Sequence, residues 1–170
     1  MNKSLKIAVD PYLCADQRRE YAGTISYDEM ERVQEHILST TQPLNVELSF
    51  SKDRKFIVVI GRIYGDLVLE CAACLGEVIL PVDIAVRLAI INDEEKASLV
   101  PELYEPWLMD DDRLMLSQLI EDELLLELPV IARHTSCPVD LPHSSSSDDY
   151  VEETEIKENP FKVLEALKKH

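Results

Sequence analysis

The chain has 170 residues, 46% of them hydrophobic, which is enough to bury one core and is most simply a single domain with appendages. No apolar run approaches the roughly 18 residues that span a bilayer, and residues 1–14 lack the apolar core of a signal peptide. These features exclude a membrane-spanning helix and predict a cytoplasmic protein. Its net charge is −16, and broad contact with bare RNA is disfavoured through the acidic second half of the chain.

The negative charge is concentrated in the second half of the chain. Residues 1–91 carry 13 acidic and 10 basic side chains, whereas residues 92–170 carry 20 acidic and 7 basic ones. An acidic surface attracts basic proteins, so we expect a basic partner. The sequence leaves open the alternative that the charge only keeps the protein soluble.

Alternation of apolar and polar residues predicts a sheet. The clearest strand ends at Ile91, because Val82, Ile84 and Val86 alternate with polar or small residues. Further strands are predicted over 44–50, 56–60 and 67–71, with short ones near 5–9 and 21–25. This close spacing indicates an antiparallel meander that is curved or barrel-like. Together with the helices described next, it places the fold in the α+β class.

Two helices are predicted to accompany this sheet. The first covers 29–38, with Ser26 or Asp28 as its N-terminal cap. The second covers 114–126, where acidic residues precede the positive end of the helix and Pro129 follows its last turn. Apolar residues surround most of the second helix, which indicates that it lies largely buried on the sheet.

Three consecutive acidic residues interrupt the second helix. At 100° per residue, Glu123 is predicted to project with the apolar residues of that helix. A buried carboxylate needs a partner, and Arg87 and Arg133 are the candidates. The sequence leaves open whether Glu121, Asp122 and Glu123 form a structural ion pair or a binding or catalytic site.

The cysteines point to a metal site. Cys71 and Cys74 form a CxxC pair at the turn between two predicted strands, which is half of a tetrahedral zinc site of the zinc-knuckle kind. His134 and Cys137 could supply the other two ligands if the segment after Pro129 folds back over the turn.

This metal site has alternatives. Cys14 or His143 could replace one of the later ligands, and four reduced structural thiols would need no metal at all. A redox pair fits less well, because a reactive CxxC normally opens a helix. Gly76 is expected to supply the positive φ that the turn needs.

The C-terminal region differs in composition from the rest. We expect one α+β domain over 1–143, a disordered acidic linker over 144–158 and a short helix over 159–170. The apolar face of this helix contains Phe161, Leu164 and Leu167, and either docks on the domain or binds a groove of a partner.

Several motifs in a fixed order identify a family resemblance. They are Asp10-Pro11, Tyr21-x-Gly23, Leu69-Glu70-Cys71-x-x-Cys74, Leu103-Tyr104-Glu105-Pro106, Glu121-Asp122-Glu123-Leu124, His134 and Asn159-Pro160-Phe161-x-x-Leu164. In this order they resemble the YceD family of bacterial large ribosomal RNA subunit accumulation proteins. The resemblance implies a non-enzymatic factor in ribosome biogenesis that is needed for 23S rRNA to accumulate.

The acidic charge and the family resemblance together predict a protein that binds a basic large-subunit ribosomal protein or a precursor particle. The predicted contact residues are Glu121, Asp122, Glu123, Phe161, Leu164 and Leu167. Zinc is the one cofactor considered. The first alternative is an RNA-processing hydrolase in which the three acidic residues hold a metal. The second is direct binding of rRNA by Arg18, Arg19, Lys52, Arg54 and Lys55.

Overall fold

The computed structural model describes residues 5, 7–109 and 111–137. The predicted linker over 144–158, the predicted helix over 159–170 and His143 lie outside these residues. For the residues described, the prediction of an α+β fold with a mainly antiparallel sheet is confirmed.

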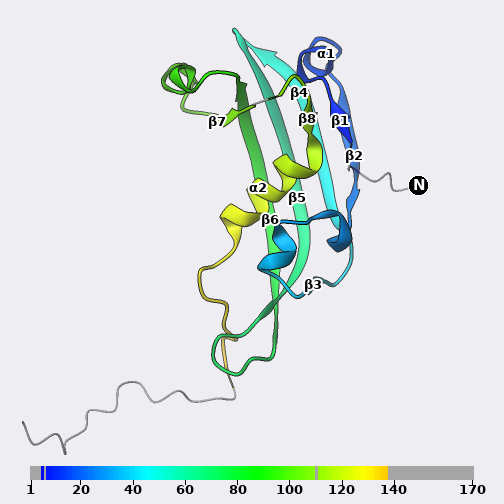
Figure 1. The fold of residues 1–170 in the computed structure, drawn as a ribbon, viewed down its shortest axis with the longest axis vertical. Coiled ribbons are helices and arrows are strands. Elements are labelled where there is room, and N and C mark those ends of the chain that lie inside the picture. The colour runs from blue at the N-terminus through cyan, green and yellow to red at the C-terminus, as the bar shows by residue number, and fades with distance from the viewer. Residues whose placement is uncertain (1–4, 6, 110, 138–170) are drawn as a thin grey trace, which may run out of the picture. The chain divides into compact units, whose positions relative to one another are not determined.

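The main sheet contains six strands in an open arrangement (Figure 1). Its path runs β2-β4-β5-β6-β7, and β3 pairs with β5 beside β4. All these pairs are antiparallel except β6 with β7. The bounds are β2 (Glu20–Ile25), β3 (Ser39–Thr40), β4 (Leu44–Asp53), β5 (Phe56–Glu70), β6 (Glu77–Ile91) and β7 (Glu105–Leu108). Among the described residues β2 and β7 lie at opposite edges, so this sheet is curved rather than closed into a barrel.

The two predicted strands over 56–60 and 67–71 are one continuous strand, β5. The residues between them stay in register with β6, from Gly61 opposite Val86 to Asp66 opposite Pro81. Gly61 makes this continuity feasible, because a Cβ at this position would overlap the carbonyl oxygen of Glu47 on β4. Gly61 therefore does not interrupt the strand but allows the backbones of β4 and β5 to approach closely.

The predicted helix over 29–38 is absent, and two 3₁₀ turns take its place: η1 (Tyr27–Glu29) and η2 (Val33–Glu35). Met30 leaves the helical region with φ −114° and ψ 75°. The backbone N–H groups of Arg32 and Val33, which a continuous helix would use internally, instead bond to the side chain of Glu121. A tertiary contact has replaced the local helical hydrogen bonds.

Helix α2 (Leu116–Glu127) lies across one face of the sheet, as predicted (Figure 1). Leu116, Leu119, Ile120 and Leu124 on its inner face are fully buried in the main core. Before α2, strand β8 (Leu114–Met115) pairs with β1 (Ala8–Val9) to form a separate two-stranded sheet.

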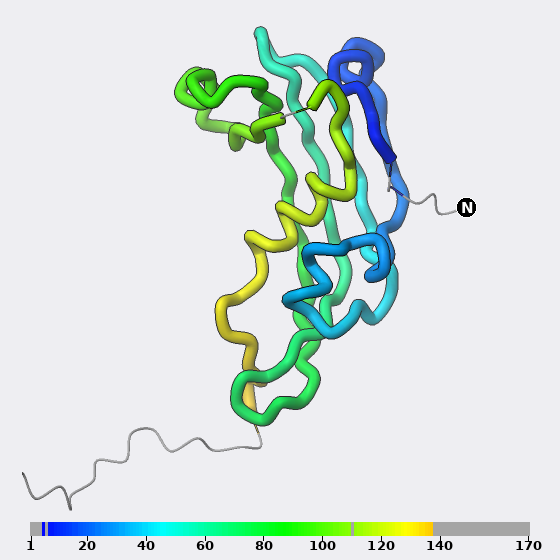
Figure 2. Tube along the Cα trace, in the orientation of Figure 1, coloured from blue at the N-terminus to red at the C-terminus, as the bar shows by residue number. Residues whose placement is uncertain are grey.

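The remaining elements are short. They are the helix α1 (Pro11–Asp16), whose first turn is capped by Asp10, and the 3₁₀ helix η3 (Glu94–Leu99). Figure 2 shows the chain leaving α2 and descending to the β5–β6 hairpin, at the end of the described residues opposite α1. No helix in the described part of the chain is long and apolar enough to cross a membrane.

Candidate metal centre

The first half of the centre is the turn between β5 and β6, residues Cys71–Gly76. Two backbone bonds close it: the Cys71 N–H donates to the Gly76 carbonyl at 2.8 Å and the Leu75 N–H donates to the Cys71 carbonyl at 2.9 Å. The residue with positive φ is Leu75, at 59°. The prediction that Gly76 takes this conformation is therefore wrong.

The second half is the segment 128–137, called the arm below, which follows α2 and folds back onto this turn. The Ala72 N–H donates to the Ala132 carbonyl at 2.9 Å. The Nε2 atom of His134 lies 2.8 Å from the Glu77 carbonyl oxygen. These two bonds bring His134 and Cys137 to the cysteine turn, although more than 55 residues separate them from Glu77 or Cys71 in sequence.

The four side chains converge on one point. The ligand atoms of Cys71, Cys74, His134 and Cys137 all lie within 4.8 Å of one another. The Sγ atoms of Cys71 and Cys137 are 3.9 Å apart, and the Sγ of Cys74 is 3.4 Å from Nδ1 of His134. Zinc–sulfur bonds of about 2.3 Å in a tetrahedron place two sulfurs about 3.8 Å apart, so these spacings fit a tetrahedral ion.

The surroundings of the ligands also suit a metal. Because Nε2 of His134 faces the Glu77 carbonyl, the proton belongs on that nitrogen and Nδ1 is left as the ligand atom. Backbone hydrogen bonds from Cys74 and His134 outweigh burial and lower the pKa of Cys71 to about 5, which favours its thiolate. For Cys74 a backbone hydrogen bond with Gly76 acts in the same direction, but burial and the neighbouring thiols raise the pKa. The group of three cysteines and one histidine could therefore hold a metal.

Cys14, the other candidate ligand that the structure describes, does not join this group, and neither does His36. Cys14 is buried in α1 at the far end of the domain, where its Sγ lies 3.2 Å from the Tyr21 hydroxyl. His36 follows η2 and lies outside the cluster. Among the described residues, the cysteine–histidine group is the one cluster that could hold a metal ion.

The three acidic residues of α2 face different surroundings. Glu121, at 5% exposed, is the buried one, and its Oε2 accepts hydrogen bonds from the backbone of Arg32 and Val33. The prediction that Glu123 is buried and pairs with Arg87 or Arg133 is therefore wrong.

Asp122 and Glu123 are both partly exposed. Asp122 pairs with the Arg32 guanidinium and accepts a hydrogen bond from Nε1 of Trp107 at 3.1 Å. Sequence reasoning missed both partners because neither lies near α2 in the chain. Partial burial, followed by the charges of Glu105 and Asp122, raises the pKa of Glu123. The three carboxylates thus do not converge as the ligands of one metal ion.

The basic residues considered for RNA binding lie around α1 and the β4–β5 turn, at the end of the main sheet opposite the cysteine turn (Figure 1). Lys52 pairs with Asp16 of α1, and the Phe50 N–H donates to the Arg19 carbonyl at 2.9 Å. Arg18 and Arg54 both lie in turns, have positive φ and are exposed.

Comparison with known proteins identifies relatives of the whole chain. The family model described as "Large ribosomal RNA subunit accumulation protein YceD" matches residues 59–168. A protein of that name from Haemophilus influenzae is 31% identical over 96% of each chain. No solved structure matches. The extent of both matches and the motif order place this chain in the YceD family of large ribosomal RNA subunit accumulation proteins.

Proposed function

We propose that this chain supports accumulation of the large-subunit rRNA as a non-enzymatic factor that binds a basic protein of the large-subunit precursor in the cytoplasm. The family supports the role in rRNA accumulation. The acidic surface built by β7 and α2 supports the nature of the partner.

The proposal of a basic partner depends on the acidic surface formed by β7 and α2. Residues 92–137 contain 12 acidic side chains and three basic ones. Glu105 of β7 lies close enough to Glu123 for its charge to raise the pKa of that carboxyl group, and Asp122 acts in the same sense. A cation from a partner would relieve this repulsion. Glu121 is buried and bonded to backbone, so the proposed contact consists of Glu105, Asp122 and Glu123.

The metal centre has a structural role in this proposal. Cys71, Cys74, His134 and Cys137 would hold Zn²⁺ as a complete set of four protein ligands. Zinc sites that catalyse reactions keep a position for water or substrate, whereas closed sites of this composition stabilise folds. A closed centre fits a binding protein better than a hydrolase.

The test is binding of purified large-subunit ribosomal proteins to the full chain at low and high salt. We expect at least one basic protein to bind, with affinity that falls as salt rises. The triple variant Glu105→Gln, Asp122→Asn, Glu123→Gln should weaken that binding. A matched variant with the same change in charge, Glu20→Gln, Asp28→Asn, Glu47→Gln, should not. Absence of a salt-sensitive partner, or equal loss in both variants, would refute the proposal.

A second candidate is direct contact with rRNA through the end that contains α1. It is favoured by the grouping of Arg18, Arg19, Lys52, Arg54 and Lys55 there. The double variant Arg54→Glu, Lys55→Glu should then abolish binding of precursor rRNA in a mobility-shift assay and leave the unfolding transition unchanged. If bare rRNA binds neither the parent nor the variant, this second candidate is excluded.

A further inference from the structure

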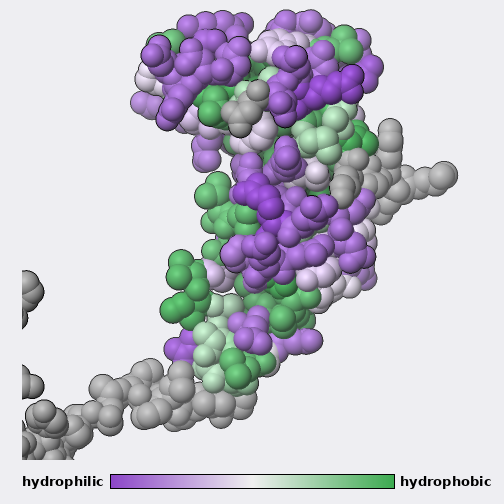
Figure 3. All heavy atoms as spheres, in the orientation of Figure 1, coloured by the Kyte–Doolittle hydropathy of each residue, from purple (hydrophilic) through white to green (hydrophobic). Residues whose placement is uncertain are grey.

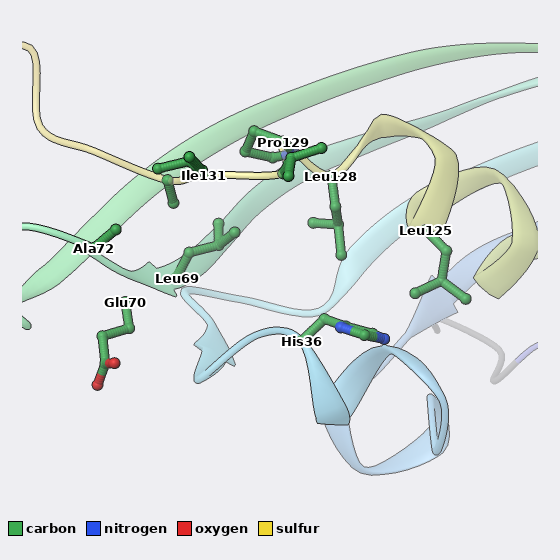
Figure 4. Close-up of a pocket in the computed structure, with 10 residues that line it drawn as sticks. His36, Leu69, Glu70, Ala72, Leu125, Leu128, Pro129 and Ile131 are labelled. Atoms are coloured by element: carbon green, nitrogen blue, oxygen red, sulfur yellow. The ribbon is translucent and has the colours of Figure 1, made fainter. Parts of the chain in front are cut away.

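A groove lined mainly by apolar side chains lies beside the metal centre, between the arm and the end of β5. Its volume is about 620 Å³, within the 300–1,000 Å³ range in which proteins commonly bind ligands. One wall contains Leu69 and Ala72, and the other contains Leu125, Leu128 and the following arm residues. In Figure 4 the side chains of Leu125 and Leu128 point across the groove toward His36.

The arm exposes an unusual amount of apolar surface here. Val130 is fully exposed and Ile131 is 64% exposed, and both line the groove. Leu126 on the adjoining turn of α2 is 77% exposed. Figure 3 shows hydrophobic atoms gathered toward this end of the molecule, whereas the opposite end is mainly hydrophilic in the same view. Exposed apolar surface of this kind usually marks an interaction site.

The two walls of the groove are connected through the metal ligands. In sequence, Cys71 lies between the lining residues Glu70 and Ala72 and Cys74 follows them, whereas His134 and Cys137 follow the second wall. Apart from the Ala72–Ala132 backbone bond, the polar contacts described between the arm and the hairpin all involve these ligand side chains. An ion shared by the four ligands would therefore fix the distance between the walls.

We propose that this groove binds an apolar segment of a basic protein and that the metal centre keeps the groove in its binding conformation. This inference rests on the proposed function and assigns a second contact for the same partner, separate from the acidic surface.

The charges at the groove select a basic partner. Of the described residues that line it, none is lysine or arginine, and Glu70 contributes a carboxylate that Figure 4 shows turned away from the lining leucines. Glu127, also exposed, lies between Leu126 and Leu128 in sequence. Apolar side chains flanked by lysine or arginine would fill the groove and place their charges near these two carboxylates.

The probe is a fluorescein-labelled amphipathic peptide with leucines on one helical face and lysines on the other. Its binding to the full, zinc-loaded chain is measured by fluorescence anisotropy. We expect Ile131→Asp to weaken binding about tenfold, as removal of a central apolar contact does at interfaces. Leu103→Asp is the control, because Leu103 is 58% exposed and does not line the groove.

Two further peptides and one variant complete the test. Peptides with serine in place of leucine, or glutamate in place of lysine, should bind at least about tenfold more weakly, because the first loses the apolar contact and the second loses the charge attraction. Cys137→Ser, with folding checked by circular dichroism, should lose binding in parallel with its zinc. Equal effects of Ile131→Asp and Leu103→Asp would overturn the proposal, as would unchanged binding by Cys137→Ser without metal.

The outcomes separate this inference from the proposed function. If a ribosomal protein binds with salt sensitivity but is unaffected by Ile131→Asp, the groove proposal fails alone. If the probe occupies the groove but no basic ribosomal protein binds the chain, the proposed function fails alone. Tighter binding by a peptide of residues 159–170 than by the probe would assign the groove to this chain's own segment and overturn the assignment to a partner.

Discussion

The carboxylate of Glu121 on α2 accepts a hydrogen bond from the backbone N–H of Arg32 at 2.7 Å, across 89 residues of sequence. A second bond, from the Val33 N–H at 3.2 Å, makes this side chain the acceptor for the first donors of η2. Without Glu121 these donors would lose a buried partner. The contact ties the segment between β2 and β4 to the helix that covers the sheet.

We expect Glu121→Gln to lower the free energy of unfolding by about 1–2 kcal/mol, because hydrogen bonds to a charged acceptor are stronger than those to a neutral amide. Urea denaturation of the metal-loaded protein measures the change. Asp122→Asn is the control, since Arg32 is exposed and Asp122 partly exposed, and ion pairs of this kind contribute less than about 1 kcal/mol. An equal loss in the two variants would contradict the structural role of Glu121.

The raised pKa of Glu123 should make the stability of the fold depend on pH. Burial, and then the charges of Glu105 and Asp122, raise its pKa in the folded protein above the ordinary value of 4.5. The folded state is therefore favoured by this group below pH 4.5, and this contribution is lost as pH rises through the folded-state pKa. Glu123→Gln removes the ionised form, so it should raise the free energy of unfolding at pH 7.5, by less than about 1 kcal/mol because these carboxylates are partly exposed and solvent screens their repulsion.

The measurement is a series of urea denaturations between pH 3 and pH 8. The gain from Glu123→Gln should shrink toward zero at the acidic end, where the parent side chain is protonated in both states. Glu20→Gln serves as the control, because Glu20 is exposed on β2, at the edge of the sheet opposite β7. A gain that is constant across the pH range would show that the charge of Glu123 is not its source.

Much of the sheet could be predicted because its pattern is local. The alternation in β6 depends only on which side of the strand faces the core, and the structure buries Val82, Ile84 and Val86 as expected. The CxxC spacing likewise places Cys71 and Cys74 at one turn. The return of the arm was only a condition for one of the alternatives considered from the sequence, and the structure brings His134 and Cys137 to that turn.

The errors arise where distant residues decide the outcome. Helical periodicity could not show which acidic residue of α2 is buried, because that depends on the Arg32 and Val33 donors. The same donors explain why 29–38 is not a helix. At the cysteine turn, Leu75 adopts the conformation expected of Gly76, and residue type alone could not identify that exception.

Gly61 of β5 and Gly76 of the cysteine turn should differ in their tolerance to substitution by alanine. An added Cβ at Gly61 would overlap the backbone carbonyl of Glu47, which cannot move without separating β4 from β5. Gly61→Ala should therefore cost more than about 2 kcal/mol of stability. Gly76→Ala meets only ordinary contacts, with Cys74 Sγ at 3.5 Å and His134 Cε1 at 3.8 Å, and should be nearly neutral. Thermal unfolding of the two variants checks this order, and a larger loss for Gly76→Ala would refute it.

Removal of the metal provides the last prediction. The purified chain should contain about one zinc ion, because Cys71, Cys74, His134 and Cys137 form a complete tetrahedral set. Cys74→Ser and His134→Ala should each lose the metal, whereas Cys14→Ser should retain it, since Cys14 bonds to Tyr21 at the far end of the domain. Elemental analysis of each purified variant measures the content.

The same ion should stabilise the fold by linkage, because it binds the folded arrangement of its ligands. At a free zinc concentration about 1,000 times the dissociation constant, this contribution is about 4 kcal/mol, so a chelator should lower the unfolding temperature of the parent and of Cys14→Ser. It should leave Cys74→Ser and His134→Ala unchanged, because they have no ion to lose. Full zinc content in Cys74→Ser, or a chelator effect that persists in it, would show that the centre lies elsewhere.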